Sequence, residues 1–276
     1  MTIPESARVT IEEGVVVGTT GRRDLKADIY IPPGRPTSAP GVLLVHGGAW
    51  REGDRSQLRG YGILLGRLGY VCVACEYRLS GEAQWPAHIH DVKAALRWMR
   101  ANSARLGVDP ARIAVEGNSA GGHLALMVAG TPNLPEFEGE GGNPGVDTSV
   151  AACIAFYAPA ELVRRNTPID VERELMGPGA SDEAYRAASP LTYARADFPP
   201  TLLMHGGNDE LVSERESVKM YEALRKAGAP VELHIYAGQP HAFDSAPLFG
   251  RQGAAIMDLF LRRYVVECAP EPVAAT

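Results

Sequence analysis

Short apolar runs recur along the chain, and their pattern predicts a mostly parallel β-sheet. Residues 9–31 alternate apolar and polar positions, as antiparallel edge strands do. After a break at residues 32–36 the apolar positions become continuous, which is typical of strands buried on both faces of a parallel sheet. The continuous runs are residues 41–45, 70–75, 113–115, 150–156 and 201–204. Residues 231–236 alternate again, so we expect them near the far edge of the sheet.

Segments with helical periodicity separate these runs. The candidates are residues 58–68, a stripe formed by Ile89, Val92, Leu96 and Met99, a segment that begins at Ser119, and residues 214–226. The last candidate is followed by Gly228, a residue type that commonly ends helices. Strands and helices that alternate in this way, with strands that are apolar on both sides, predict a doubly wound α/β fold.

The chain is interpreted as one domain, because it contains no internal repeat and no linker that would divide it. We expect the domain to span residues 1–268 and the tail at residues 269–276 to be loose. Residues 160–199 form a long insertion between two strands. Such an insertion at the carboxyl end of a strand usually covers a site, so we expect a lid or pocket wall. A surface excursion without a role at the site is the alternative.

Composition narrows the range of partners and compartments. The 276 residues carry a formal net charge of −6, which disfavours nucleic acid and anionic membranes, because both attract positive surfaces. No apolar stretch is long enough to span a bilayer, and the first residues lack the features of a secretory signal. The four cysteines are too few for a disulfide framework in a chain of this length. Buried free thiols and a cytoplasmic location are therefore expected.

A metal site is not expected from the cysteines or from the histidines. Cys72 and Cys75 are three residues apart on a predicted strand and would point to opposite faces of the sheet. His88, His90 and Asp91 form a second cluster, but positions i and i+2 diverge on a helix. We interpret this second cluster as the solvated start of a helix.

The strongest chemical signal is the hexapeptide 117–122, GNSAGG, directly after the apolar run at residues 113–115. A serine with glycines at i−2 and i+2 fits a sharp turn from strand to helix, where its hydroxyl projects from the end of a sheet. Side chains at the glycine positions would collide with the neighbouring strand and helix. Ser119 is therefore the candidate nucleophile, provided that a base and an acid follow it.

Both partners follow Ser119 at the ends of predicted strands. Asp209 lies in the segment 205–209, HGGND, and His241 follows the last strand, so their order matches that expected for a nucleophile on this type of turn. We assign His241 as the general base and then acid, and Asp209 as the group that orients the imidazole. Glu210 and Asp244 are competing acids. Glu210 would point differently from the same turn, and Asp244 is too close to His241 in sequence to reach its far nitrogen.

A glycine-rich loop at residues 46–50, HGGAW, is the candidate oxyanion hole. A tetrahedral intermediate needs backbone N–H donors aimed at its developing negative charge. We expect these donors from Gly48, Ala49 and Ala120, the last immediately after the nucleophile. An ordinary glycine-rich turn would be the alternative if the loop stood alone.

Taken together, the segments HGGAW, EYRL at residues 76–79, GNSAGG, HGGND and the final histidine resemble the α/β-hydrolase superfamily. They are nearest to the hormone-sensitive-lipase-like esterases. Residues 85–113 are similar to the bacterial branch that contains acetylxylan and feruloyl esterases. The resemblance spans residues 41–243 and implies an α/β-hydrolase fold and a carboxylic-ester hydrolase without a cofactor.

The chain departs from the family pattern at three places. Ala49 stands where many relatives carry a third glycine, which keeps the N–H but adds a methyl group on the acyl side. Glu76 replaces a common aspartate and is interpreted as structural support. Only about 40 residues precede the oxyanion loop, which is too few for a large N-terminal cap. Small to medium acyl or aryl esters are therefore expected in place of long-chain lipids.

The remaining aromatic and imidazole side chains have weaker assignments. Trp50 and Trp85 are candidates for the substrate pocket, although large aromatic residues are as often part of a core. His46 is expected to shape its own loop, and His123, one turn beyond Ser119, is expected to pack. His205 and His234 receive no role.

Two other functions remain open at this stage. The same triad would also serve an amide-bond hydrolase, such as an arylformamidase or a peptidase, because both reactions share a tetrahedral intermediate. A non-catalytic small-molecule receptor is a more remote alternative. The expected partner is a small-molecule ester, and the exposed last strand could pair with its copy in a homodimer.

Overall fold

The computed structural model describes residues 8–34, 36–163 and 170–267, and eight strands form one sheet in the order β1-β2-β4-β3-β5-β6-β7-β8. The strands are β1 Thr10–Thr19, β2 Asp24–Ile31, β3 Ala39–Val45, β4 Val71–Cys75, β5 Val108–Asn118, β6 Ala152–Phe156, β7 Thr201–Gly206 and β8 Val231–Tyr236. Strands β1, β2 and β4 pair antiparallel, whereas all neighbours from β4 to β8 pair parallel. The predicted α/β-hydrolase fold with antiparallel N-terminal strands is confirmed.

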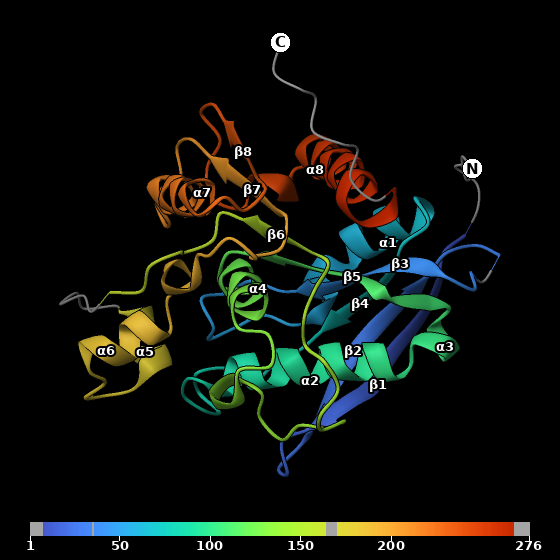
Figure 1. Ribbon diagram of the computed structural model, residues 1–276, viewed down its shortest axis with the longest axis horizontal. Coiled ribbons are helices and arrows are strands. Elements are labelled where there is room, and N and C mark those ends of the chain that lie inside the picture. Colours follow the sequence, from blue (N-terminus) through green and yellow to red (C-terminus); the bar gives the residue numbers. More distant parts are fainter. Residues whose placement is uncertain (1–7, 35, 164–169, 268–276) are drawn as a thin grey trace.

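Helices cover both faces of this sheet (Figure 1). The helices are α1 Arg59–Arg67, α2 Ala87–Ala101, α3 Ser103–Leu106, α4 Ala120–Gly130, α5 Val171–Met176, α6 Asp182–Ala187, α7 Arg215–Ala227 and α8 Pro247–Leu261. Short 3₁₀ turns lie at η1 Arg55–Leu58, η2 Pro135–Phe137, η3 Pro190–Tyr193 and η4 Phe243–Ser245, and a π turn lies at η5 Arg262–Val266. Apolar side chains of α2, α4 and α7 pack in one core, and those of α1 and α8 pack in the core on the opposite face.

The two-sided burial of the central strands explains their continuous apolar sequence. All five residues of β4 are buried, and Cys72 and Cys75 belong to the cores on opposite faces, as their spacing predicts. At the edge, β8 is only partly buried, which agrees with its alternating pattern. Helix α7 ends at Gly228, which has the left-handed φ of 89° expected of a C-cap glycine.

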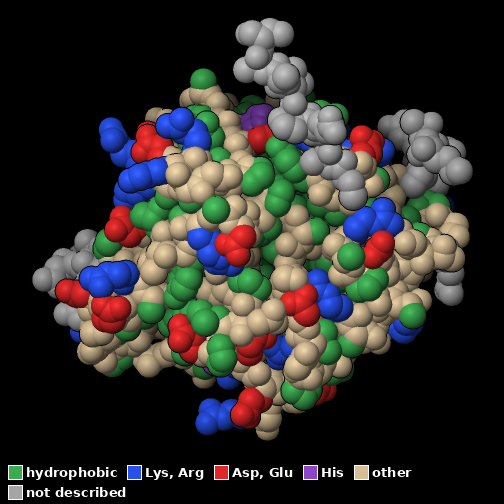
Figure 2. Space-filling model, in the orientation of Figure 1, with side chains coloured by type: hydrophobic (Ala, Val, Ile, Leu, Met, Phe, Trp, Pro, Cys, Tyr) green, Lys and Arg blue, Asp and Glu red, His purple; other side chains and the backbone are tan. Residues whose placement is uncertain are grey.

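The surface carries mixed charge. Figure 2 shows positive and negative side chains interspersed over the face that it displays, in keeping with the modest net charge of −6. Within residues 8–34, 36–163 and 170–267, no helix has the length and apolar character needed to cross a membrane. The predicted loose tail, Cys268 and residues 164–169 of the predicted lid lie outside the described residues.

Candidate active site

Ser119 lies on a sharp turn between β5 and α4. Its backbone has φ 55° and ψ −118°, a combination that residues other than glycine rarely adopt. The flanking glycines make the turn possible. A Cβ at Gly117 would lie 2.2 Å from the carbonyl oxygen of Gly121, and a Cβ at Gly121 would lie 2.0 Å from that of Val45. The glycine spacing therefore reflects the close approach of β3, β5 and α4.

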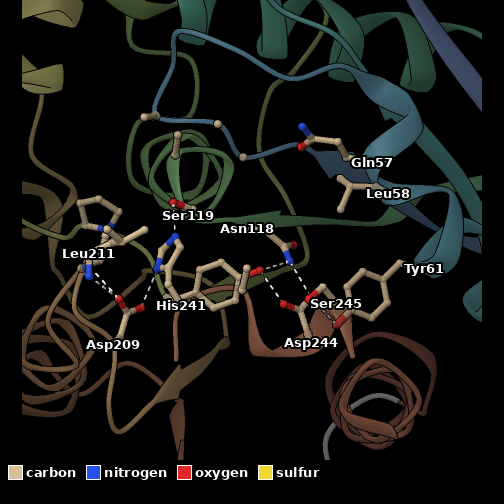
Figure 3. A pocket seen from close by; sticks show the side chains of 18 of the residues that line it. Gln57, Leu58, Tyr61, Asn118, Ser119, Asp209, Leu211, His241, Asp244 and Ser245 are labelled. Atoms are coloured by element: carbon tan, nitrogen blue, oxygen red, sulfur yellow. Dashed lines mark hydrogen bonds and ion pairs between the residues drawn. The ribbon is translucent and has the colours of Figure 1, made fainter. Parts of the chain in front are cut away.

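The side chains of Ser119, His241 and Asp209 form a hydrogen-bonded chain (Figure 3). His241 Nε2 lies 2.9 Å from Ser119 Oγ, and His241 Nδ1 lies 2.6 Å from Asp209 Oδ2. Because a carboxylate oxygen accepts, Nδ1 carries the hydrogen, and Nε2 is left to accept from the serine hydroxyl. Three segments far apart in sequence thus meet at the carboxyl edge of the sheet.

Asp209 is held by more than its contact with His241. Its other oxygen, Oδ1, accepts hydrogen bonds at 2.9 Å from the backbone N–H groups of Leu211 and Val212. The imidazole of His205 lies 3.3 Å from Oδ2 and also contacts the Val212 carbonyl and the Ser217 hydroxyl. Burial lowers the pKa of His205, which favours the neutral ring. Sequence reasoning missed this supporting role, although His205 lies only four residues before Asp209 in the HGGND segment.

The HGGAW loop approaches Ser119 from the end of β3. Gly48, Ala49 and Trp50 all have positive φ, at 114°, 50° and 58°, and the Gly48 carbonyl accepts from the N–H groups of Arg51 and Glu52. Among the described residues, no acceptor is found for the N–H of Gly48 or of Ala49. Ala120 is the first residue of α4, and N–H groups in a first helical turn have no partner inside the helix. These three N–H groups are available to an oxyanion.

His46 stabilises the same loop, as expected. Its Nδ1 lies 2.7 Å from the Gly47 carbonyl oxygen, and its ring stacks on Tyr77 with 4.2 Å between the ring centroids. Burial lowers the pKa of His46. The ring is therefore a neutral support that fixes the loop.

A second carboxylate, Asp244, lies on the other side of Ser119 (Figure 3). Its Oδ1 accepts from the Tyr157 hydroxyl at 2.6 Å, and its Oδ2 accepts from the Tyr61 hydroxyl at 2.9 Å and from Asn118 Nδ2 at 2.8 Å. The Tyr157 ring in turn packs edge-on against His241, with 4.6 Å between the ring centroids. Asp244 therefore supports the turn and the imidazole from outside the Ser119–His241–Asp209 chain.

Glu116 is a buried carboxyl group behind this network, on β5 and three residues before Ser119. The side chain is fully buried, and neither carboxyl oxygen has a hydrogen-bond partner among the described residues. Burial, followed by the negative charge of Asp244, raises the pKa of Glu116 well above its ordinary value. Glu116 is therefore held in its neutral form.

The two tryptophans that we expected at the substrate pocket differ in position. Trp50 is only 2% exposed but contributes to the cavity wall, and its Nε1 donates to His123 Nδ1 at 3.2 Å. Trp85 is not among the residues that line the cavity, and its ring packs against His123 and Phe137. Burial lowers the pKa of His123 to about 4, in agreement with the packing role expected for this residue.

The expected solvated helix start at His88, His90 and Asp91 is wrong. His88 and Asp91 are 0% and 1% exposed, and the His88 ring packs against Tyr77. Asp91 forms an ion pair with Arg78 at 2.7 Å, and burial lowers the pKa of His88 to about 3. In the described part of the chain, no three His, Cys, Asp or Glu side chains are grouped in a way that could hold a metal ion.

A continuous cavity of about 1340 Å³ opens around Ser119. One arm is lined by the segment that follows β6, including Pro159, Glu161 and Val171. The other arm runs between α1 and α8. Glu210, a competing acid in the sequence, lines the cavity, whereas Asp209 contacts His241.

Comparison with known proteins identifies the family of this chain. The model of the BD-FAE family matches residues 27–224. The carboxylesterase NlhH of Mycobacterium tuberculosis is 32% identical over 84% of this chain and 75% of its own length. The probable carboxylic ester hydrolase LipM of the same organism is 37% identical over 83% of this chain. This chain spans about half of LipM, 54% of its length.

A solved structure extends the similarity over nearly the whole chain. A thermophilic esterase of Thermogutta terrifontis, esterase 2, shares 28% identity and a TM-score of 0.80, covering 98% of this chain and 96% of its own. The same esterase has been solved with butyrate bound and phosphorylated by paraoxon. By sequence and by structure, this chain belongs to the BD-FAE family, within the hormone-sensitive-lipase-like branch of the α/β-hydrolase serine esterases.

Proposed function

We propose that the protein hydrolyses carboxylic esters of small to medium size through an acyl-enzyme on Ser119. The observation that carries this proposal is the hydrogen-bonded chain from Ser119 Oγ through His241 to Asp209, which opens into the cavity. A serine hydroxyl becomes an effective nucleophile when an oriented base can take its proton. The distances of 2.9 Å and 2.6 Å along this chain support that requirement.

The first half of the reaction forms the acyl-enzyme. Ser119 Oγ attacks the ester carbonyl while His241 Nε2 takes the hydroxyl proton, and the Asp209 carboxylate stabilises the imidazolium that forms. The carbonyl oxygen becomes an oxyanion. As the tetrahedral intermediate collapses, the carbon–oxygen bond to the alcohol breaks, and His241 gives its proton to the leaving oxygen.

The second half restores the enzyme. A water molecule loses a proton to His241 Nε2 and attacks the acyl carbon, and the resulting intermediate expels Ser119 Oγ, which takes the proton back. In both halves we assign the N–H groups of Gly48, Ala49 and Ala120 to the oxyanion. Each aligned donor of this kind contributes roughly 3–4 kcal/mol to transition-state stabilisation.

The relatives support an ester over an amide. NlhH and LipM are a carboxylesterase and a probable carboxylic ester hydrolase by name, and the Thermogutta esterase binds butyrate, a short acyl product. We therefore infer short to medium acyl groups for this chain and assign Glu161, Asp170, Val171 and Glu172, the residues of the predicted lid that line the cavity, as a pocket wall. The cytoplasmic location and the pairing of two copies through β8 stay predictions.

Hydrolysis of p-nitrophenyl butyrate by the wild type and by Ser119→Ala tests the proposal. We expect the variant to lose at least about 10⁴-fold in kcat. Paraoxon should add a phosphoryl group, detected by mass spectrometry, to the wild type and to the control Ser213→Ala but not to Ser119→Ala. Ser213 lines the same cavity, so it controls for labelling of any nearby hydroxyl.

A wild type no faster than Ser119→Ala would overturn the assignment. An arylformamide and its ester analogue, measured side by side, separate the two bond types. A higher kcat/KM on the arylformamide would replace the ester by an amide while keeping the same residues.

A further inference from the structure

The arm of the cavity between α1 and α8 has no role in the proposed reaction of Ser119. Helices α1 and α8 lie side by side (Figure 1), and Tyr61 of α1 donates a hydrogen bond to Asp244 of η4, the turn just before α8. The arm starts beside Ser119 and is lined, from the two helices, by Gly60, Leu64, Arg67, Pro247, Gly250 and Arg251. The groove is therefore lined by apolar residues and by two arginines, one from each helix.

The residues from α1 line one continuous face. Gly60, Leu64 and Arg67 are spaced i, i+4 and i+7, so they lie along the same side of the helix. With a rise of about 1.5 Å per residue, Arg67 lies about 10 Å beyond Gly60 along the axis. A Cβ built at Gly60 meets no atom within 4 Å, so this side of the helix faces open space. The groove is long enough for an extended substrate limb.

Arg67 and Arg251 differ from other arginines on or beside the same helices. Arg59 forms an ion pair with Glu13, and Arg262 forms one with Asp258. Arg67 and Arg251 are exposed, and within residues 8–34, 36–163 and 170–267 neither side chain has an ion-pair or hydrogen-bond partner. Two uncompensated positive charges thus line the groove of a protein whose net charge is −6.

Among the described residues, no acidic side chain that lines the cavity forms an ion pair with either arginine. Asp244, at the inner end of the groove, already accepts hydrogen bonds from Tyr157, Tyr61 and Asn118. In the opposite arm, Glu161 and Glu216 both pair with Lys219. The groove therefore offers an apolar path that leads from the serine to positive charge.

We propose that this groove binds the longer limb of the ester and that Arg67 and Arg251 bind a carboxylate at the far end of that limb. The substrate class is then an ester that carries an anionic group several bonds from the scissile carbonyl. A guanidinium group suits this role because its N–H donors match the geometry of a carboxylate. The inference rests on the proposed ester hydrolysis.

Two matched pairs of substrates test the charge. In the first, the mono-p-nitrophenyl ester of suberic acid is compared with the same compound bearing a terminal carboxamide, so that the anion lies in the acyl group. In the second, 8-acetoxyoctanoate is compared with 8-acetoxyoctanamide, so that the anion lies in the alcohol. In one of the two pairs we expect a higher kcat/KM for the anion, and the preferred pair identifies which limb occupies the groove.

The variants Arg67→Gln and Arg251→Gln should each reduce that preference by about fivefold, because exposed charge pairs are weakened by solvent. The double variant should abolish it, and added salt should weaken it in the wild type. Arg22→Gln removes the same charge from an exposed residue beyond β1, outside the cavity, and should leave the preference intact. Gly60→Phe should lower kcat/KM for the anion of the preferred pair relative to p-nitrophenyl acetate, because the ring would fill the groove.

Hydrolysis of p-nitrophenyl acetate by each protein reports the Ser119 chemistry separately. If acetate is hydrolysed but anion and amide react equally in both pairs, the inference about the arginines is overturned while the ester hydrolase remains. A preference that persists in the double variant overturns it as well. If the wild type does not hydrolyse acetate either, the proposed function fails and the inference fails with it.

Discussion

Two carboxylates flank Ser119, and they do different work. Asp209 is joined to His241 by a hydrogen bond of 2.6 Å and is fixed by two backbone N–H groups. Asp244 has no contact of this kind with His241 and is instead occupied by the hydroxyls of Tyr157 and Tyr61 and by the amide of Asn118. One carboxylate faces the imidazole nitrogen, and the other holds the scaffold around it.

The role of each carboxylate follows from the hydrogen-bond donors that contact it, and not from its distance to His241 in the sequence. Asp244 is only three residues from His241, yet its oxygens accept hydrogen bonds from Tyr157, Tyr61 and Asn118 instead. Asp209 comes from the end of another strand and approaches Nδ1 directly. Replacing each carboxylate by an amide, which exchanges one acceptor oxygen for an NH₂ donor, separates the two roles.

The largest effect is expected from Asp209→Asn. The amide would stabilise the wrong imidazole tautomer, with Nε2 protonated, so that Ser119 loses its base. We expect kcat on p-nitrophenyl butyrate to fall about 10⁴-fold with little change in the circular dichroism spectrum. A loss smaller than tenfold would contradict the role assigned to Asp209.

A smaller loss of activity is expected from Asp244→Asn. Its new NH₂ group would face groups that now donate to the carboxylate, which leaves polar atoms unsatisfied in a partly buried place. We expect the free energy of unfolding, measured in urea, to fall by about 1–3 kcal/mol and kcat to fall less than tenfold. Tyr61→Phe, which removes only one of the three donors, is the matched control and should cost about 1 kcal/mol. If kcat falls as far as in Asp209→Asn, the distinction between the two carboxylates is lost.

The smallest effect on activity, with an effect on stability of opposite sign, is expected from Glu116→Gln. Its pKa is raised in the folded protein, so the folded state keeps a proton that the unfolded chain releases above about pH 4.3. Wild-type stability then falls as pH rises from that value toward the folded-state pKa, by up to about 1.4 kcal/mol per pH unit. Glutamine does not titrate, so the variant should match the wild type near pH 4 and be more stable at pH 8. Urea melts of both proteins across this range give the comparison, and parallel curves would show that Glu116 is ionised when folded.

Much of the architecture was predictable because burial leaves a pattern in the sequence. The continuous runs became central strands, the alternating runs became β1, β2 and β8, and Gly228 ends α7. The triad residues could be selected because each follows a strand. Since parallel strands end at one edge of the sheet, short local motifs were enough to bring Ser119, Asp209 and His241 to the same place.

The wrong expectation concerns buried polar residues. The sequence indicated a solvated helix start at His88 and Asp91, but Arg78 pairs with Asp91 there and permits its burial. Polar residues can be buried when segments distant in sequence supply their hydrogen-bond or ion-pair partners, and the local sequence does not show which segments these are. For the same reason the sequence did not indicate the roles of His205, Tyr157 and the buried Glu116.

The sequence by itself determined the class of fold, the order of the strands along the chain and the residue types at their carboxyl ends. These depend on local periodicity and on glycines at positions where neighbouring backbone segments lie too close for a side chain. The tertiary structure decided which carboxylate contacts His241, and it placed two arginines without partners among the described residues beside the groove between α1 and α8. Those features depend on distances between groups far apart in sequence, which are set only when the two cores pack.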